Sequence, residues 1–74
     1  MIGPGQVGER VVVRHKYDVV DGRQRYTDVT GELCDYAANT VAVRRDSGEI
    51  VTVRKADIVA AKPIPPKIHR PLRP

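Results

Sequence analysis

The sequence predicts an all-β domain, a small barrel of about five antiparallel strands with one single-turn helix before the last strand. The first observation is the apolar composition: twelve Val and five Ile, but only two Leu and neither Phe nor Trp. β-Branched side chains fit a pleated sheet and lose rotamer freedom in a helix, so we expect almost no α-helix. The second observation is that these residues alternate with polar ones in short runs, which turn residues separate.

The clearest local signal is a β-hairpin over residues 39–53. Val41 and Val43 alternate with other residues, and an apolar run resumes after the turn. The turn itself, Asp46-Ser47-Gly48, has the length and the final glycine typical of a type I turn followed by a left-handed residue. We expect nearly all other apolar residues to pack against this hairpin.

Two longer strands are predicted before the hairpin, at residues 7–17 and 25–36. Residues 18–24 between them are expected to form a polar loop or a hairpin tip, because Asp21-Gly22 is a strong turn signal. Gly31 interrupts an alternating apolar pattern. Since glycine weakens a flat strand but permits a coiled one, Gly31 indicates a bulge or a sharp bend.

The chain after the hairpin completes the predicted order. Residues 55–57 break the alternation for about one helical turn, and residues 58–62 form a short last strand that Pro63 ends, because proline cannot donate to a ladder. This order is that of a Src-homology-3-like small barrel, and closure would also protect the edges of a small Val-rich sheet. The alternative is an open four-stranded antiparallel sheet that completes its core on a partner domain.

The chain is long enough for one domain. We divide it into a flexible N-terminal lead-in at 1–6, the barrel at 7–62 and a proline-rich basic tail at 63–74. The tail holds five of the six prolines, which favours an extended course and excludes a regular helix. It is expected to be an interdomain linker; a ligand for a proline-recognising groove or a basic arm on nucleic acid are the alternatives.

Charge is informative by position. The net charge of +4 lies entirely in residues 62–74, whereas residues 1–61 hold nine bases and nine acids. The single cysteine, Cys34, excludes an internal disulfide and suits a reducing compartment. With neither a signal peptide nor a membrane span evident, we expect a soluble cytoplasmic protein.

The sequence offers no catalytic, cofactor-binding or metal-binding site, and we expect that the chain by itself is not an enzyme. Ser47 is explained by its turn, and His15 and His69 are far apart and lack a metal-ligand spacing with Cys34. Neither a phosphate-binding loop nor a dinucleotide fingerprint is present. Binding is therefore the class of function that remains.

Two sets of residues are candidates for an interaction surface. The first is basic and lies on the 39–53 hairpin and just beyond it: Arg44, Arg45, Arg54 and Lys55. Basic edges of small barrels bind nucleic acid when aromatic platforms accompany them, but acidic residues are interleaved here. The second set is the three tyrosines, Tyr17, Tyr26 and Tyr36, which would line a groove or a cation cage, or else simply cover the ends of the core.

Four segments of the chain carry a family resemblance: VGERVVVR at 7–14, TDVTGEL at 27–33, SGEIV at 47–51 and ADIVAAKP at 56–63. They resemble the N-terminal Src-homology-3-like domain of an actinobacterial group of GNAT-type N-acetyltransferases, some described as mycobacterial histone acetyltransferases. The most specific pieces are residues 28–33 and 57–63. In that group a similar Ala-Ala-Lys-Pro segment and a proline-rich linker precede the acetyltransferase domain.

The resemblance implies a non-catalytic accessory module of an acetyltransferase. Its partner would be a catalytic acetyltransferase domain in the same chain or another protein, with no role for a membrane and with the oligomeric state left open. The acetyl-CoA loop of that family has no match here, so no cofactor is expected on this chain. The alternative function is a free-standing small barrel that binds nucleic acid through the basic hairpin and the tail.

Overall fold

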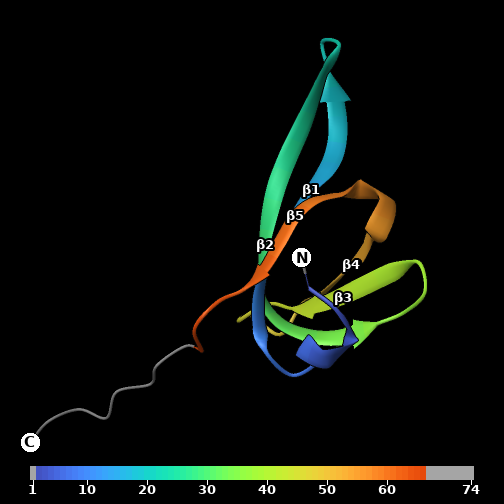
Figure 1. Cartoon of the computed structure of the whole chain (residues 1–74). Coiled ribbons are helices and arrows are strands. Elements are labelled where there is room, and N and C mark those ends of the chain that lie inside the picture. Colours follow the sequence, from blue (N-terminus) through green and yellow to red (C-terminus); the bar gives the residue numbers. More distant parts are fainter. Residues whose placement is uncertain (1, 67–74) are drawn as a thin grey trace, which may run out of the picture.

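The computed structural model describes residues 2–66, and within them the protein is all-β, as predicted (Figure 1). The five strands form one antiparallel sheet in the order β4-β3-β2-β1-β5. In chain order the elements are η1 (Pro4–Gln6), β1 (Arg10–Val20), β2 (Arg23–Tyr36), β3 (Thr40–Arg44), β4 (Ile50–Arg54), η2 (Lys55–Asp57) and β5 (Ile58–Pro63). Within residues 2–66, no helix has the length and apolar character needed to cross a bilayer.

The core consists mainly of β-branched side chains from the inner faces of the strands. Its fully buried members come from β1, β2 and β3: Val11, Val13, Leu33, Val41 and Val43. Alternation places such residues on one face of each strand, which is why the sequence pattern identifies them. Val29 and Val53 complete the same cluster, with Ala61 contributed by β5.

The N-terminal segment differs from the flexible lead-in expected for residues 1–6. Ile2 is only 5% exposed and belongs to the core cluster. The 3-10 turn η1 follows it, and the Gly3 amide donates a hydrogen bond of 2.6 Å to the side-chain oxygen of Gln6. The segment is ordered because Ile2 brings apolar surface to the core, a contact that sequence spacing does not reveal.

The β1–β2 hairpin is longer than expected. Of the two forms predicted for residues 18–24, the hairpin tip is the one observed: the strands continue to a two-residue turn at Asp21-Gly22, with Val20 opposite Arg23. The turn residues Asp21 and Gly22 both have positive φ, 52° and 75°, as a tight hairpin requires. The tip of the hairpin therefore projects away from the barrel as a two-stranded ribbon (Figure 1). We call its outer part, residues 16–26, the arm.

Gly31 lies where the backbone of β2 closely approaches the end of β3. A Cβ atom at this position would overlap the carbonyl oxygen of Arg44 and lie 2.7 Å from its carbonyl carbon. The register shift predicted near Gly31 lies slightly further on, between Leu33 and Asp35, where β2 turns from pairing with β1 to pairing with β3. Glycine is thus required for close backbone approach, and the bulge that follows bends the strand.

The β3–β4 hairpin and the last strand match their predictions. Arg44 pairs with Ile50, Gly48 has φ 93°, and the Gly48 amide donates to the Arg45 carbonyl at 2.8 Å. The predicted helical turn is η2, and β5 runs antiparallel to β1 up to the pair Val11 and Pro63. The greater part of the predicted tail, residues 67–74, lies outside the described residues.

Candidate interaction surfaces

The four predicted basic residues occupy two opposite ends of the β3–β4 hairpin. Arg44 pairs with Ile50 beside the turn, whereas Arg54 pairs with Thr40 at the other end of the two strands. Arg45 lies next to Arg44, and Lys55 follows Arg54 in η2. The structure therefore separates the four residues into two pairs and does not form one continuous basic patch.

Three of these four residues pair with an acid, and the fourth lies over an aromatic ring. Nitrogen–oxygen distances are 3.6 Å from Arg44 to Glu32, 3.5 Å from Arg45 to Glu49 and 3.1 Å from Arg54 to Asp57. The Lys55 ammonium lies over the Tyr36 ring, 3.7 Å from its centroid. These exposed pairs add little to stability, but they leave the hairpin bases engaged with groups of the protein itself.

Two further arginines pair with acids on other strands. Arg10 donates to Asp46 at 2.9 Å, and Arg14 donates to Asp28 at the same distance. The hydrogen bond from Arg14 lowers the pKa of the Asp28 carboxyl below its ordinary value and raises the pKa of the Arg14 guanidinium. Asp28, part of the exposed face of β2, is thus held as a carboxylate by a cross-strand partner.

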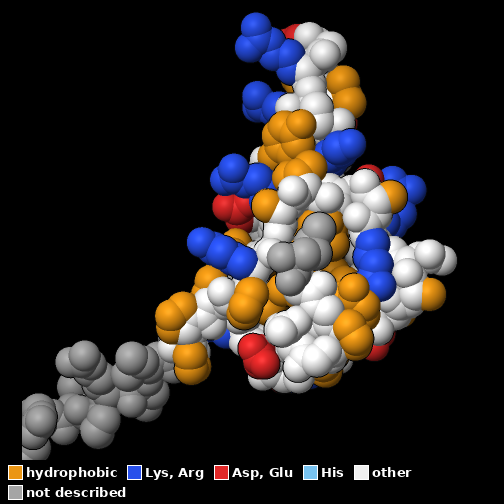
Figure 2. Space-filling view, viewed as in Figure 1, with side chains coloured by type: hydrophobic (Ala, Val, Ile, Leu, Met, Phe, Trp, Pro, Cys, Tyr) orange, Lys and Arg blue, Asp and Glu red, His pale blue; other side chains and the backbone are white. Residues whose placement is uncertain are grey.

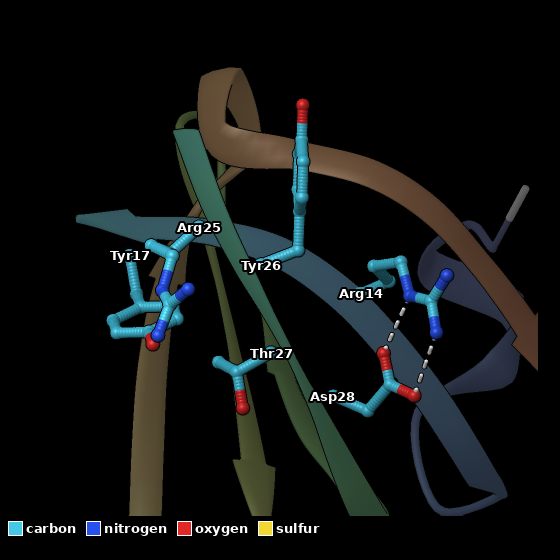
Figure 3. A pocket seen from close by; sticks show the side chains of 6 residues that line it. All are labelled: Arg14, Tyr17, Arg25, Tyr26, Thr27 and Asp28. Carbon is cyan, nitrogen blue, oxygen red and sulfur yellow. Dashed lines mark hydrogen bonds and ion pairs between the residues drawn. The ribbon is translucent and has the colours of Figure 1, made fainter. Parts of the chain in front are cut away.

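The three tyrosines do not form one groove. Tyr36 packs partly buried against the core, beside Ile2 and Lys55 at a small hollow. Tyr17 and Tyr26 lie on the arm, where both side chains are about half exposed. In Figure 3 the Tyr26 ring extends to the opposite side of the ribbon from Tyr17. A single groove or cage lined by all three rings is therefore excluded, because a long stretch of β2 separates Tyr26 from Tyr36.

The arm carries three bases besides the four predicted on and beside the β3–β4 hairpin. Lys16, Arg23 and Arg25 have no ion-pair partner among residues 2–66, in contrast to the five paired arginines of the barrel. Beside them are exposed apolar side chains, of which Val19 is 60% exposed. Figure 2 shows these basic and hydrophobic groups together along the projecting ribbon.

A hollow of about 530 Å³ lies at the base of the arm (Figure 3). Arg25, Tyr26, Thr27 and Asp28 contribute to its lining from β2, with additional residues from β1. Successive residues of a strand point to opposite faces, so a hollow that all four residues line follows the edge of β2. This edge is open: between Arg23 and Thr30 the described structure pairs β2 with β1 alone.

The serine, the cysteine and the described histidine each contact backbone groups of the fold. Ser47 accepts a hydrogen bond from the Glu49 amide at 3.4 Å in the turn, and the Cys34 thiol donates to the Ala42 carbonyl at 3.4 Å. The His15 Nδ1 atom lies 3.0 Å from the Lys16 carbonyl oxygen. Residues 2–66 contain no cluster of three acidic, His or Cys side chains placed to hold a metal ion. His69 lies outside the described residues.

The comparison with protein families matches residues 5–62 to the model described as the Rv0428c N-terminal Sm-like domain. The chain belongs to this family. Membership agrees with the single five-stranded sheet and supports an N-terminal domain that is a small barrel. No curated protein and no solved structure gives a significant match.

Proposed function

We propose that this member of the Sm-like domain family is a non-catalytic interaction module that forms the N-terminal part of a GNAT-type N-acetyltransferase. In this role the barrel is a rigid platform, and acetyl transfer belongs to a separate catalytic domain. The description of the family as an N-terminal domain supports the position in a longer protein. The likeness of residues 28–33 and 57–63 to the acetyltransferase group supports the identity of the catalytic part.

The observation that carries the interaction role is the arm. A two-stranded ribbon outside a barrel is only marginally stable in water, and this one exposes four large apolar side chains: Tyr17, Val19, Val20 and Tyr26. Surfaces of this kind commonly mark binding sites. The arginines of the barrel, by contrast, already pair with acids of the described residues.

A comparison of the complete enzyme with a version that lacks residues 1–62 tests this proposal. Thiol release from acetyl-CoA is measured with a small amine acceptor and with a protein acceptor. We expect similar turnover of the small amine by both enzymes and a raised KM for the protein acceptor in the truncated one. The 74-residue chain alone should release no thiol. Equal KM values, or a stop codon directly after the codon for Pro74, would contradict the proposal.

Nucleic-acid binding is the second candidate, and the unpaired bases Lys16, Arg23 and Arg25 favour it. Asp18 and Asp21 on the same arm oppose it, because phosphates would meet negative charge near the tip. Titration of the chain with duplex DNA and single-stranded RNA at two salt concentrations separates the two functions. Phosphate contacts must give an affinity that falls as salt rises, whereas a protein-binding module shows no such complex at low salt.

A further inference from the structure

We propose that the open edge of β2, from Arg23 to Thr30, binds an extended acidic segment of a partner protein as an additional β-strand. The inference rests on the proposed interaction role and deepens it, since it names the surface and the chemistry of the partner. Strand addition uses backbone hydrogen bonds for affinity and alternate side chains for specificity. Both components are present along this edge.

The backbone component comes from the unequal pairing of β2. The strand spans Arg23–Tyr36, yet only the part from Glu32 to Tyr36 pairs with β3. Between Arg23 and Thr30 its other edge has no neighbouring strand in the described structure. Every second residue of such an edge directs its amide and carbonyl outwards, and these groups are ready to pair with another chain.

The space component is the hollow at the base of the arm. Arg25, Tyr26, Thr27 and Asp28 line it in sequence, so it follows the strand edge over the length that a short peptide would occupy. Tyr26 on one side of the ribbon and Tyr17 on the other border this space (Figure 3). An incoming strand would therefore meet an aromatic side chain on each of its faces.

The charge component selects the partner. Arg23 and Arg25 are two residues apart, share a face of β2 and have no carboxylate partner within residues 2–66. An added strand with acidic residues at alternate positions would place them beside these guanidiniums. Two copies of this protein paired antiparallel through the same edge would set Arg25 opposite Thr27 or Val29 and would give it no carboxylate directly opposite. An acidic segment supplies that carboxylate, provided that it lies beside Arg23 and Arg25 and away from Asp18 and Asp21 near the tip.

The position of the arm leaves its open edge accessible to a segment of a partner protein. β5 ends where Pro63 pairs with Val11, at the start of β1, whereas the arm forms the far end of the β1–β2 hairpin. The described chain leaves the barrel away from the tip of the arm (Figure 1). A segment from another protein can reach the open edge without passing around the barrel.

The test uses the 74-residue chain and two short synthetic peptides, one of alternating Glu and Val and one of alternating Lys and Val. Amide chemical shifts are followed by NMR during titration. We expect the Glu peptide to shift the amides of residues 23–30 with saturation, and the Lys peptide to leave them unchanged. Equal responses to both peptides, or shifts confined to β4 or β5, would overturn the proposal.

A charge exchange provides the decisive variant. The double substitution Arg23→Glu and Arg25→Glu should weaken binding of the Glu peptide about tenfold or more and create binding of the Lys peptide. The matched control, Arg44→Glu with Arg45→Glu, makes the same change in net charge on the barrel and should leave the affinity for the Glu peptide unchanged. Well-dispersed amide spectra establish that both variants fold.

The outcomes also separate this inference from the function on which it rests. Suppose that Arg23→Glu with Arg25→Glu leaves the affinity for both peptides unchanged, while the truncated enzyme still has a raised KM for its protein acceptor. The edge of β2 is then not the docking site, and the proposed function as an interaction module stands. If duplex DNA or RNA shifts the arm amides and the Glu peptide does not, the arm is a nucleic-acid site and the acidic-strand proposal is wrong.

Discussion

Substitution of Gly31 by Ala should remove a large part of the stability of the fold. The added Cβ would overlap the Arg44 carbonyl oxygen and lie 2.7 Å from the carbonyl carbon, where ordinary contacts begin at 3.4 Å. The Arg45 Cα atom lies 3.1 Å away, so the whole end of β3 has to move. These atoms belong to backbone that pairs with both β2 and β4 and cannot rotate aside.

The expected cost follows from this geometry. Overpacking of a rigid site costs about 1–3 kcal/mol, and obstruction by backbone places Gly31→Ala near the upper value. A domain of this size has a free energy of unfolding of about 4–11 kcal/mol. A loss of about 3 kcal/mol lowers Tm by roughly 12–24 °C at this chain length. The variant should thus be partly unfolded at temperatures at which the parent chain is stable.

Thermal and urea unfolding, followed by far-UV circular dichroism, measure this effect. Gly5→Ala is the matched control, because it adds the same methyl group where no atom lies within 4 Å and φ is not positive. It should change the free energy of unfolding by no more than about 0.5 kcal/mol. A difference of less than about 1 kcal/mol between the free energies of unfolding of Gly31→Ala and Gly5→Ala would contradict the close approach of the β2 and β3 backbones at Gly31.

Three further predictions concern the core and two charged contacts. Leu33→Ala removes a fully buried side chain and should lower the free energy of unfolding by about 2–5 kcal/mol in a urea titration; a loss below 1 kcal/mol would mean that the site collapses without a cavity. Arg14→Gln should raise the pKa of Asp28 towards 3.8, as measured by carboxyl NMR. Because the pKa of Asp28 is lowered in the folded state, its contribution to stability is present above pH 3.8 and is lost as pH falls through the folded value; an unchanged pKa in the variant would exclude the hydrogen bond as the cause. Lys55→Met keeps the aliphatic stem but removes the charge over Tyr36, so it should cost about 0.5–1 kcal/mol and shift the ring protons of Tyr36, and unchanged ring shifts would argue against the contact.

The parts of the fold that the sequence predicts well are those that local chemistry dictates. The turn at Asp46-Ser47-Gly48 needs a left-handed residue, and glycine provides it at φ 93°. The single turn of η2 and the end of β5 at Pro63 likewise follow from a break in alternation and from the missing amide of proline. Each of these features is determined by a few consecutive residues.

The turn of the arm follows from Asp21-Gly22, but the length of its two strands does not, because no core lies beneath them. Alternation identifies a strand when one face is buried, but residues 18–24 are largely exposed on both faces and thus resemble a polar loop. The order of Ile2 was missed for a related reason, since its burial depends on a tertiary contact. Sequence patterns report burial on one face, and both cases depart from that condition.

The pairing of the predicted basic residues also depends on tertiary structure. Arg44 meets Glu32 because the register of β2 and β3 places them opposite one another, and Arg10 meets Asp46 across 36 positions of sequence. Neither of these two pairs can be predicted from the sequence without knowledge of the strand register. Composition correctly located a charge balance in residues 1–61, but it could not show which bases were already engaged.

This difference between engaged bases and bases that have no ion-pair partner within residues 2–66 is the reason why we propose the arm as the binding surface. An acidic partner that approaches Arg44 or Arg45 has to displace Glu32 or Glu49, so one ion pair replaces another and the net gain is small. A carboxylate beside Arg23 or Arg25 would displace no acid of residues 2–66, so its interaction would not be offset by the loss of an existing pair. Backbone groups along the same edge contribute hydrogen bonds in addition. The arginines of the barrel are therefore already paired, whereas the arm keeps bases and a strand edge that the proposed acidic segment would use.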